Sequence, residues 1–243
     1  MIIRPTLWQI PQPDPEVIAN LKTKSATLAK RLQEIAASHT CVRFASSLAV
    51  EDMVITDVIA KERLNIEIFT LDTGLLHKET LDLLDDIHNV YSNIRVQRFQ
   101  PHAEDTQKFV DEHGKQAYYK SVALRRQCCF LRKIEPLNRA LSGADAWLTG
   151  QRREQSATRT ELPLAERDQG RNMDKYNPIF DWSEQDVWAY ILVHHVPYNP
   201  LYQQGFPSIG CEPCTRPIKQ EEDIRAGRWW WENKDSKECG LHK

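Results

Sequence analysis

Short apolar runs alternate with helix-like segments between residues 40 and 150, and this alternation limits the possible fold more than any other feature of the sequence. The runs at 40–45, 66–71, 94–99 and 146–150 have the length and composition of buried strands. The segments between them, such as 78–90, carry apolar residues at helical spacing. Strands separated by helices pair in parallel through right-handed crossovers. The sequence therefore predicts an α/β fold with a mostly parallel sheet flanked by helices.

The flanking segments complete this outline. Residues 14–38 have an acidic, proline-containing start and apolar residues at helical spacing, which predicts one or two covering helices. A single helix is expected over 121–141, and a mobile, arginine-rich loop over 151–175. Ser183 and Asp186 form a capping signature that starts a further helix. We expect three parts, an N-terminal helical cover, an α/β body and a flexible C-terminal tail, over residues 1–39, 40–217 and 218–243.

Charge and hydropathy argue against several classes of partner. The chain carries 32 Lys and Arg against 34 Asp and Glu, a formal net charge of -2, so we expect no nucleic-acid partner. No run approaches the ~20 apolar residues of a membrane span. The start Met1-Ile-Ile-Arg-Pro lacks the features of a secretory signal. We therefore expect a cytoplasmic protein without a membrane partner, in which thiols stay reduced.

Four of the six cysteines form a Cys-Cys pair and a Cys-x-x-Cys motif, at Cys128, Cys129, Cys211 and Cys214. Four thiolates bind either zinc or a [4Fe–4S] cluster, and the spacing does not choose between them. Adjacent cysteines on a helix point about 100° apart, so the pair predicts a crowded site. A redox-active Cys-x-x-Cys and a set of simple buried thiols are the alternatives.

The helix expected around the Cys-Cys pair is strongly basic. It holds six cations between Lys120 and Arg139 and one acid, Glu135. These cations would balance the negative charge of four thiolates or attract an anionic substrate. Lys133, four residues after Cys129, is the strongest candidate for such a role, whereas Lys120 and Arg139 fit a solvated face.

Two loops follow predicted strands, at the positions where parallel sheets bind ligands. The 46–52 loop leads into a helix, where free N–H groups and the hydroxyls of Ser46 and Ser47 would bind an anion. The loop contains no glycine and fits no phosphate-loop template, so a plain connection is the alternative. After the next strand, Asp72-Thr73-Gly74 offers acceptors for a ribose or a base edge, but turn chemistry explains it equally well.

A lone cysteine lies near the C-terminus. Cys239 stands on a polar segment where burial is not expected, three residues before His242. A reduced cysteine in such a place is either inert or a nucleophile, and a nearby histidine would help to hold its thiolate.

Taken in order, these motifs resemble the assimilatory adenylylsulfate (APS) reductases, the iron–sulfur branch of the APS/PAPS reductase family. The resemblance runs from about residue 40 to the end of the chain. It is carried by Ser-x-x-Ala-x-Glu-Asp-Met at 46–53, Leu-Asp-Thr-Gly at 71–74, Cys-Cys-x-x-Arg-Lys-x-Glu-Pro-Leu at 128–137, Thr-Gly-x-Arg-Arg-x-Gln-Ser at 149–156, Gly-Cys-x-Pro-Cys-Thr-Arg at 210–216, Arg-Ala-Gly-Arg-Trp-Trp-Trp-Glu at 225–232 and Glu-Cys-Gly-Leu-His at 238–242. Several of these motifs are diagnostic on their own.

The resemblance implies a fold like that of the adenine nucleotide alpha hydrolases, with a body that binds a nucleotide and a [4Fe–4S] cluster. It implies thioredoxin-dependent reduction of APS to sulfite and AMP, in sulfate assimilation and cysteine biosynthesis. The sulfur would pass through an S-sulfocysteine on Cys239, and a glutaredoxin-like protein is an alternative electron donor. The resemblance also implies a homo-oligomer.

The family's site residues carry over position by position. Catalytic roles fall to Cys239, His242, Lys133, Arg225 and Arg228, and the cluster falls to the four cysteines of the Cys-Cys and Cys-x-x-Cys motifs. Substrate contacts fall to Ser46, Ser47, Glu51, Asp52, Leu71, Asp72, Thr73, Gly74, Gly150, Arg152 and Arg153. The absence of glycine from the 46–52 loop departs from the usual pattern, which leaves open how closely its backbone approaches the phosphosulfate.

Two other functions fit parts of the sequence. A PAPS reductase, or an enzyme that accepts both substrates, would share the terminal motif, although reductases of the 3′-phosphorylated substrate usually lack the four cysteines. A zinc-stabilised nucleotide-binding regulatory protein would keep the cysteines without a redox role. The implied mechanism needs no redox change at the cluster, so we expect it to link the 121–141 helix to the 210–217 loop.

Overall fold

A computed structural model describes residues 6–155 and 161–233 of the chain. Its helices and strands are α1 Pro15–Ser38, β1 Val42–Ala45, α2 Val50–Glu62, β2 Glu67–Leu71, α3 Lys78–Val90, β3 Val96–Phe99, α4 Ala103–His113, α5 Val122–Cys129, α6 Glu135–Ala140, β4 Ala146–Leu148, β5 Ala165–Asp168, β6 Met173–Tyr176 and α7 Glu184–Val193. A π-helical turn joins α5 to α6, and short 3-10 turns lie at Ala117–Tyr119, Arg153–Gln155, Pro200–Gln204 and Glu212–Cys214.

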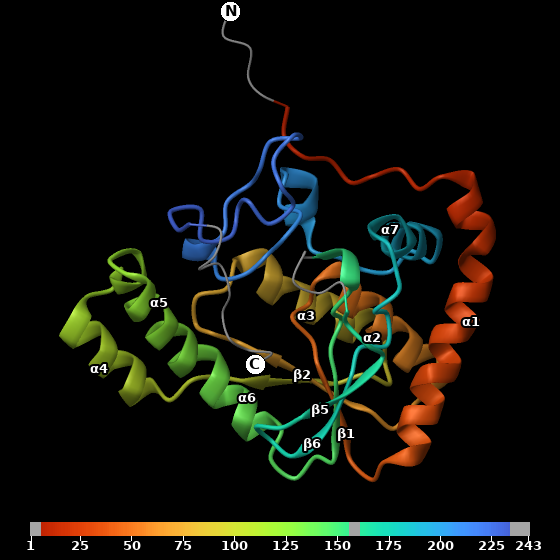
Figure 1. The fold of residues 1–243 in the computed structure, drawn as a ribbon, viewed down its shortest axis with the longest axis horizontal. Helices are drawn as coiled ribbons and strands as arrows, with labels where there is room; N and C mark the ends of the chain where they lie inside the picture. The colour runs from red at the N-terminus through yellow and green to blue at the C-terminus, as the bar shows by residue number, and fades with distance from the viewer. Residues whose placement is uncertain (1–5, 156–160, 234–243) are drawn as a thin grey trace, which may run out of the picture.

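The strands form one six-stranded sheet in the order β3-β2-β1-β4-β6-β5 within the described residues (Figure 1). All neighbours pair in parallel except β5 and β6, which form an antiparallel pair at one edge. Phe44 at the centre of β1 lies opposite Ile68 of β2 on one side and Leu148 of β4 on the other. The predicted α/β fold with a mostly parallel sheet is confirmed.

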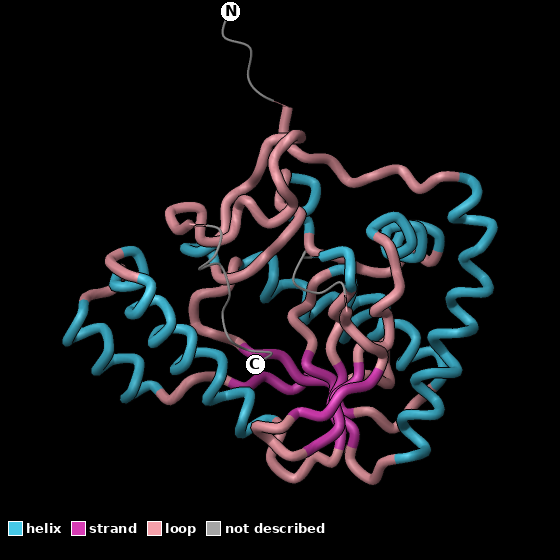
Figure 2. Tube along the Cα trace, in the orientation of Figure 1, coloured by secondary structure: helices cyan, strands magenta, loops and turns pink. Residues whose placement is uncertain are grey.

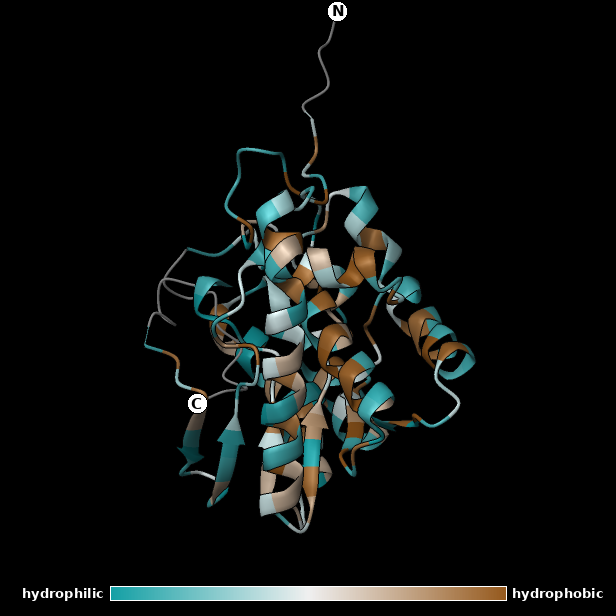
Figure 3. Cartoon of the chain, turned by 90° about the vertical axis from the view of Figure 1, so that its right-hand side faces the viewer, coloured by the Kyte–Doolittle hydropathy of each residue, from teal (hydrophilic) through white to brown (hydrophobic). Residues whose placement is uncertain are grey.

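Helices cover both faces of the sheet. Helices α1, α2 and α7 pack against one another on one face, over the larger hydrophobic core. Helix α6 covers β2 and β3 on the other face, where Leu137 packs against Phe69 and Trp147. Figure 1 shows α4, α5 and α6 on the opposite side of the molecule from α1. The buried side chains of α1 recur at helical spacing, at Leu21, Leu28, Leu32 and Ile35, and Figure 3 shows much of its outward surface as hydrophilic or neutral.

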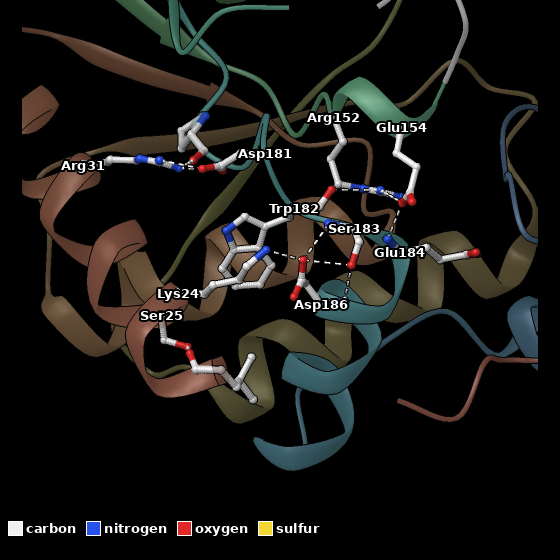
Figure 4. A network of polar contacts seen from close by, with 12 residues as sticks. Lys24, Ser25, Arg31, Arg152, Glu154, Asp181, Trp182, Ser183, Glu184 and Asp186 are labelled. Atoms are coloured by element: carbon white, nitrogen blue, oxygen red, sulfur yellow. Dashed lines mark hydrogen bonds and ion pairs between the residues drawn. The ribbon is translucent and has the colours of Figure 1, made fainter. Parts of the chain in front are cut away.

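Polar contacts hold α1 to the segment that starts α7 (Figure 4). Arg31 makes two 2.8 Å bonds to the carboxylate of Asp181, and Lys24 pairs with Asp186. Ser183 and Asp186 also form a reciprocal capping box, as the sequence predicted. The N-terminal helix is therefore fastened to the body by charged as well as apolar contacts.

The arginine-rich segment expected to be a loop contains two strands, β5 and β6. The sequence did not predict β6, because one of its two buried positions, Met173 and Lys175, is a lysine. A buried lysine breaks the alternation of apolar and polar residues by which a strand is recognised in a sequence. Lys175 is buried through a 2.9 Å ion pair with Glu166 of β5. Arg167 likewise pairs with Asp174 across the hairpin at 2.7 Å. The prediction of a mobile loop over all of 151–175 is wrong.

The helix expected over 121–141 is interrupted by a π-helical turn at Phe130–Ile134. Pro136 gives a physical reason, because its ring has no N–H and would collide with the carbonyl group four residues earlier in a regular α-helix. The N–H group of Glu135 instead bonds to the carbonyl oxygen of Phe130, five residues back. The wider turn follows the Cys-Cys pair directly and carries Lys133.

The C-terminal segment returns to the body. Residues 205–233 run as turns and loops, and Figure 2 shows these loop-rich segments gathered on one side of the sheet. Trp229 is 1% exposed, and Thr215 forms a β-bridge with Arg228. The part of the predicted tail that the structure describes is therefore packed. None of the described helices is long and apolar enough to cross a membrane.

Candidate functional site

A cavity of about 260 Å³ opens at the carboxyl ends of β1, β2 and β4. Residues of the 207–211 loop and of the 224–229 segment complete its wall. The predicted site residues that line it are Ser46, Ser47, Glu51, Asp52, Leu71, Thr73, Lys133, Gly150, Arg152, Cys211, Arg225 and Arg228. Strands with helical crossovers bring these distant positions together, since parallel strands end at the same edge of a sheet.

Several predicted residues lie elsewhere. Asp72 is buried beside the cavity, where its carboxylate accepts bonds from Gly74 at 3.0 Å, Arg98 at 2.6 Å and Gln100 at 2.7 Å. Arg153 lies over the ring of Phe180, 4.6 Å from its centroid. Asp72, Gly74 and Arg153 do not line the cavity. Asp72 and Gly74 bond to each other within a turn, and Arg153 packs on Phe180. Cys239 and His242 lie outside the described residues.

The segment after β1 is shorter than expected, because α2 begins at Val50 and places Glu51 and Asp52 in its first turn. Acidic residues are favoured there by the helix dipole. The backbone N–H and the hydroxyl of Ser47 both donate to Asp52 at 2.6 Å. Leu48 takes the left-handed conformation, φ 63°, that a glycine would usually supply. The loop therefore makes its tight turn at Leu48 without a glycine. Its two Ser47 donors already bond to Asp52 of the following helix.

Asp52 is the most strongly perturbed carboxyl of the cavity wall. Burial raises its pKa to about 7, against the lowering effect of the bonds from Ser47 and from the backbone of Gly150. Its Oδ1 atom would lie 2.1 Å from a Cβ atom built on Gly150. Only glycine therefore fits beside Asp52 at this point of the wall.

Arg152 and Glu51 form a buried ion pair at 2.9 Å, and Arg152 is 2% exposed. Arg152 also bonds to Glu154 at 3.0 Å and to the carbonyl oxygen of Trp182 at 3.2 Å. Gln155 adds a 3.0 Å bond to Glu51. The Arg152 guanidinium lines the cavity, but these bonds all go to the protein, which indicates that it holds the wall in place.

Three cations reach the cavity from two parts of the chain. Lys133 comes from the π-helical turn, whereas Arg225 and Arg228 come from the C-terminal segment. Arg228 is oriented by a 2.9 Å bond to the carbonyl oxygen of Ile209 and lies 4.9 Å from the ring centroid of Trp229. This concentration of positive charge on one cavity suits an anionic ligand.

The four cysteines of the two motifs are all buried, and none of them forms a disulfide bond within the described residues. The pKa of Cys128 is raised to about 11, mainly by burial and also by the neighbouring Cys129 and Cys211, whereas Arg132 opposes the shift. Burial likewise raises the pKa of Cys214 to about 12, with Cys211 and Cys129 adding to the effect and Lys133 opposing it. The four thiols thus share one electrostatic environment. Within the described ranges, no group of three or more His, Cys, Asp or Glu side chains could hold a metal ion as placed.

Polar groups surround these thiols. The hydroxyl of Thr73 lies 3.2 Å from the sulfur of Cys211. Arg132 hydrogen-bonds Cys128 and donates to the carbonyl oxygen of Thr73 at 2.8 Å. Cys128 and Arg132 are four residues apart, a spacing that places them on one helix face. That spacing was a signal in the sequence, but we assigned no individual role to Arg132.

Arg125 was missed in the same way, four residues before Cys129. It is 0% exposed, hydrogen-bonds Cys129 and bonds to Glu232 at 2.6 and 3.0 Å. Its guanidinium lies 4.6 Å from the ring centroid of Trp229. Arg125 therefore ties the Cys-Cys helix to the C-terminal segment, a long-range contact that local sequence patterns do not reveal.

Comparison with known proteins agrees with this site. Residues 42–217 match the phosphoadenosine phosphosulfate reductase domain family. A protein of Neisseria meningitidis serogroup A named adenosine 5'-phosphosulfate reductase is 67% identical over 100% of this chain and 99% of its own length. A protein of Burkholderia cepacia with the same name is 52% identical over 94% of this chain and 89% of its own length.

A crystal structure of phosphoadenylyl-sulfate (PAPS) reductase from Candida auris, in complex with phosphate, has the same fold. Its TM-score is 0.68 at 26% identity, over 86% of this chain and 100% of that one. The sheet order, the cavity at the strand ends and the family match converge on one assignment. The chain belongs to the APS/PAPS reductase family.

Proposed function

We propose that the protein reduces adenosine 5'-phosphosulfate to sulfite and AMP in sulfate assimilation. One observation carries this proposal: a single cavity at the strand ends is lined by Lys133, Arg225 and Arg228 and adjoins four buried thiols. The names of the most similar relatives support APS as the substrate. Thioredoxin, or a glutaredoxin-like protein, would supply the two electrons.

The nucleotide would lie along the strand ends with its phosphosulfate toward the three cations. Charge develops on the sulfate oxygens and on the leaving phosphate during transfer, and fixed cations stabilise that charge. The Ser47 donors support the loop through Asp52, so the cations carry most of the anion binding in this proposal.

Cys239 is the proposed nucleophile. Its thiolate attacks the sulfate sulfur, the bond between sulfur and the bridging oxygen breaks, and AMP leaves with the bonding electron pair. A thioredoxin thiolate then attacks the sulfur of Cys239 and releases sulfite, and its second thiol resolves the mixed disulfide. His242 would help to hold the Cys239 thiolate.

A [4Fe–4S] cluster is the proposed cofactor, held by Cys128, Cys129, Cys211 and Cys214. The donor set fits this group, because all four thiols are buried together without carboxylate or imidazole competitors among their nearest partners. One zinc ion is the alternative occupant of the same four thiolates, and metal analysis of the purified protein separates the two. When bound, the group would supply negative charge and a cross-link between α5 and the 211–214 turn.

Incubation with APS alone, followed by intact mass spectrometry, tests the proposal directly. We expect a sulfonate adduct on Cys239 that reduced thioredoxin removes as sulfite. Cys239→Ser should give no adduct and keep its iron, whereas Cys211→Ser should lose iron and turnover together. Anaerobic protein should contain about four irons per chain. Stoichiometric zinc without iron, or an adduct that persists in Cys239→Ser, would contradict the proposal.

PAPS reduction is the second candidate, favoured by the fold shared with the Candida auris PAPS reductase. Turnover of APS and PAPS by the same anaerobic preparation separates the two activities. We expect a clear preference for APS, and a preference for PAPS would reverse the assignment.

A further inference from the structure

Gly210 and Arg228 lie against each other in the wall of the cavity, which they line from different segments of the chain. A Cβ atom built on Gly210 would lie 2.6 Å from Cζ and 3.0 Å from Nη1 of Arg228, and closer still to Nη2. Gly210 does not have a positive φ, so its backbone conformation alone does not require glycine. The Arg228 guanidinium therefore occupies the space that a side chain at position 210 would need.

The main chain around Gly210 is held on both sides. Its N–H group donates to the Thr215 hydroxyl at 3.1 Å, and that hydroxyl donates to the carbonyl oxygen of Cys211 at 3.0 Å. The N–H group of Glu212 bonds to the carbonyl oxygen of Leu75 at 2.8 Å. A larger residue at position 210 would therefore displace the guanidinium group rather than the loop.

The residues just before Gly210 orient the same guanidinium group. Nη1 of Arg228 donates to the carbonyl oxygen of Ile209 at 2.9 Å and to the hydroxyl of Ser208 at 3.4 Å. The main chain of Arg228 is fixed by its β-bridge with Thr215, so only its side chain can shift. Residues 208–210 thus receive the guanidinium together, because two of them accept its hydrogen bonds and the third leaves it room.

We infer that Gly210 is a positioning residue, which sets the place of the Arg228 guanidinium in the cavity. The inference rests on the proposed function, in which Arg228 stabilises the negative charge of the phosphosulfate. An arginine side chain is long and flexible, so a methyl group at position 210 would move the guanidinium with little effect on folding stability. Anion binding would weaken, because a charge-assisted hydrogen bond depends on its distance and direction.

A double-mutant cycle tests the inference, with ADP as the probe. The β-phosphate of ADP stands in the place of the sulfate, and ADP offers no sulfur to reduce. Calorimetric titration gives its dissociation constant for wild-type protein, Gly210→Ala, Arg228→Met and the double variant. We expect Gly210→Ala to weaken ADP binding about tenfold, the size of one charge-assisted hydrogen bond. The double variant should bind ADP no more weakly than Arg228→Met alone.

Gly170→Ala is the matched control, since a Cβ atom there meets only an ordinary 3.5 Å contact, and it should bind ADP like wild-type protein. Unchanged ADP affinity in Gly210→Ala would overturn the inference. A further loss on adding Gly210→Ala to Arg228→Met would overturn it too, because the glycine would then act on another part of the wall. Loss of iron from anaerobic Gly210→Ala would assign the glycine to the cysteine group instead, and would also overturn it.

Melting temperatures establish whether the variants are folded. If Gly210→Ala alone does not fold, the double variant decides, because its methionine ends before the colliding guanidinium atoms. Recovery of folding in the double variant supports the contact, and no recovery overturns it. APS turnover is measured separately. Wild-type protein that binds ADP without reducing APS would contradict the proposed function, while the cycle would still test the contact between Gly210 and Arg228.

Discussion

Asp52 and Gly150 approach each other so closely in the cavity wall that each limits what the other position can hold. Asp52 lies in the first turn of α2, where its carboxyl group accepts bonds from Ser47, and Gly150 leaves the space that this group needs. The sequence alone marks both as motif residues. Their contact explains why a carboxyl group and a glycine occur together across 98 positions of chain.

Stability should depend on pH through Asp52. Burial raises its pKa from 3.8 to about 7, so the folded protein holds this proton more tightly than the unfolded chain. The resulting stabilisation is complete below about pH 4 and is lost as the pH rises to about 7. Asp52→Asn removes the titration, so the stability of the variant relative to wild type should rise over this window, by on the order of 4 kcal/mol. Urea denaturation of both proteins from pH 4 to pH 7 measures their free energies of unfolding. A difference in unfolding free energy that does not change with pH would refute the prediction.

Gly150→Ala should be costly because its methyl group would fall 2.1 Å from Asp52 Oδ1 and 3.2 Å from Glu51 Cβ. Overpacking of this kind destabilises by about 1–3 kcal/mol and would displace the first turn of α2. Gly170→Ala is the matched control, since its nearest contact would be an ordinary 3.5 Å from Asp168. Thermal denaturation of both variants tests whether Gly150→Ala destabilises the protein more than Gly170→Ala does. Equal melting temperatures would contradict this prediction.

At the scale of elements, the π-helical turn and the ion pair between Arg125 and Glu232 explain how α5 and the turn after it contribute to both the cysteine group and the cavity. The turn at Phe130–Ile134 lets α5 bury Cys128 and Cys129 while Lys133 reaches the cavity. Arg125 then connects α5 to Glu232 and Trp229. The cysteine group and the cavity are thus built from the same two segments.

Arg125→Met should destabilise the protein by about 3 kcal/mol, because it leaves the Glu232 carboxylate buried without its cation. Arg139→Met provides the control, since its pair with Glu135 is partly exposed and should contribute less than about 1 kcal/mol. Urea denaturation of the two variants compares these costs. Similar values for both would show that the buried pair does not hold the C-terminal segment.

At the scale of the whole molecule, the N-terminal segment packs against the C-terminal segment and against Tyr202, a residue of the cavity wall. The backbone N–H of Trp8 bonds to the carbonyl oxygen of Ile218 at 3.0 Å, and Leu7 bridges Lys219. The ring of Trp8 lies 6.4 Å from that of Tyr202. The hydroxyl of Tyr202, a residue of the cavity wall, accepts the backbone N–H of Val50 at 3.1 Å. Figure 1 shows this red segment running next to the blue loops of the C-terminal part.

Trp8→Ala should therefore weaken both stability and ligand binding. We expect a loss of about 2 kcal/mol in unfolding free energy, since the side chain is half-buried, and weaker binding of AMP. Val90→Ala removes an apolar side chain that is 57% exposed and should change neither quantity. Calorimetric unfolding and AMP titration test the pair of variants. If the Trp8→Ala protein is less stable but binds AMP with unchanged affinity, the contacts of Trp8 do not support the cavity.

Local patterns in the sequence were sufficient for the order of strands and helices up to β4, the capping box at Ser183 and twelve of the residues that line the cavity. Period and capping are properties of neighbouring residues, so they can be seen without the fold. The motifs that resemble the APS/PAPS reductases also indicated the family from the sequence alone. Individual roles within the motifs were less certain, as Arg152 shows by directing its hydrogen bonds to protein groups.

Only the tertiary structure decided which groups are engaged and which are available. Lys175 lies in a strand because Glu166 of a neighbouring strand neutralises it, and Ser47 is occupied because Asp52 turns back toward it. Arg125 finds its partner 107 residues away, at Glu232. The close approach of Gly210 to Arg228 likewise appears only once both segments are placed. Burial and long-range pairing depend on residues far apart in the chain, whereas sequence periodicity reports on neighbours alone.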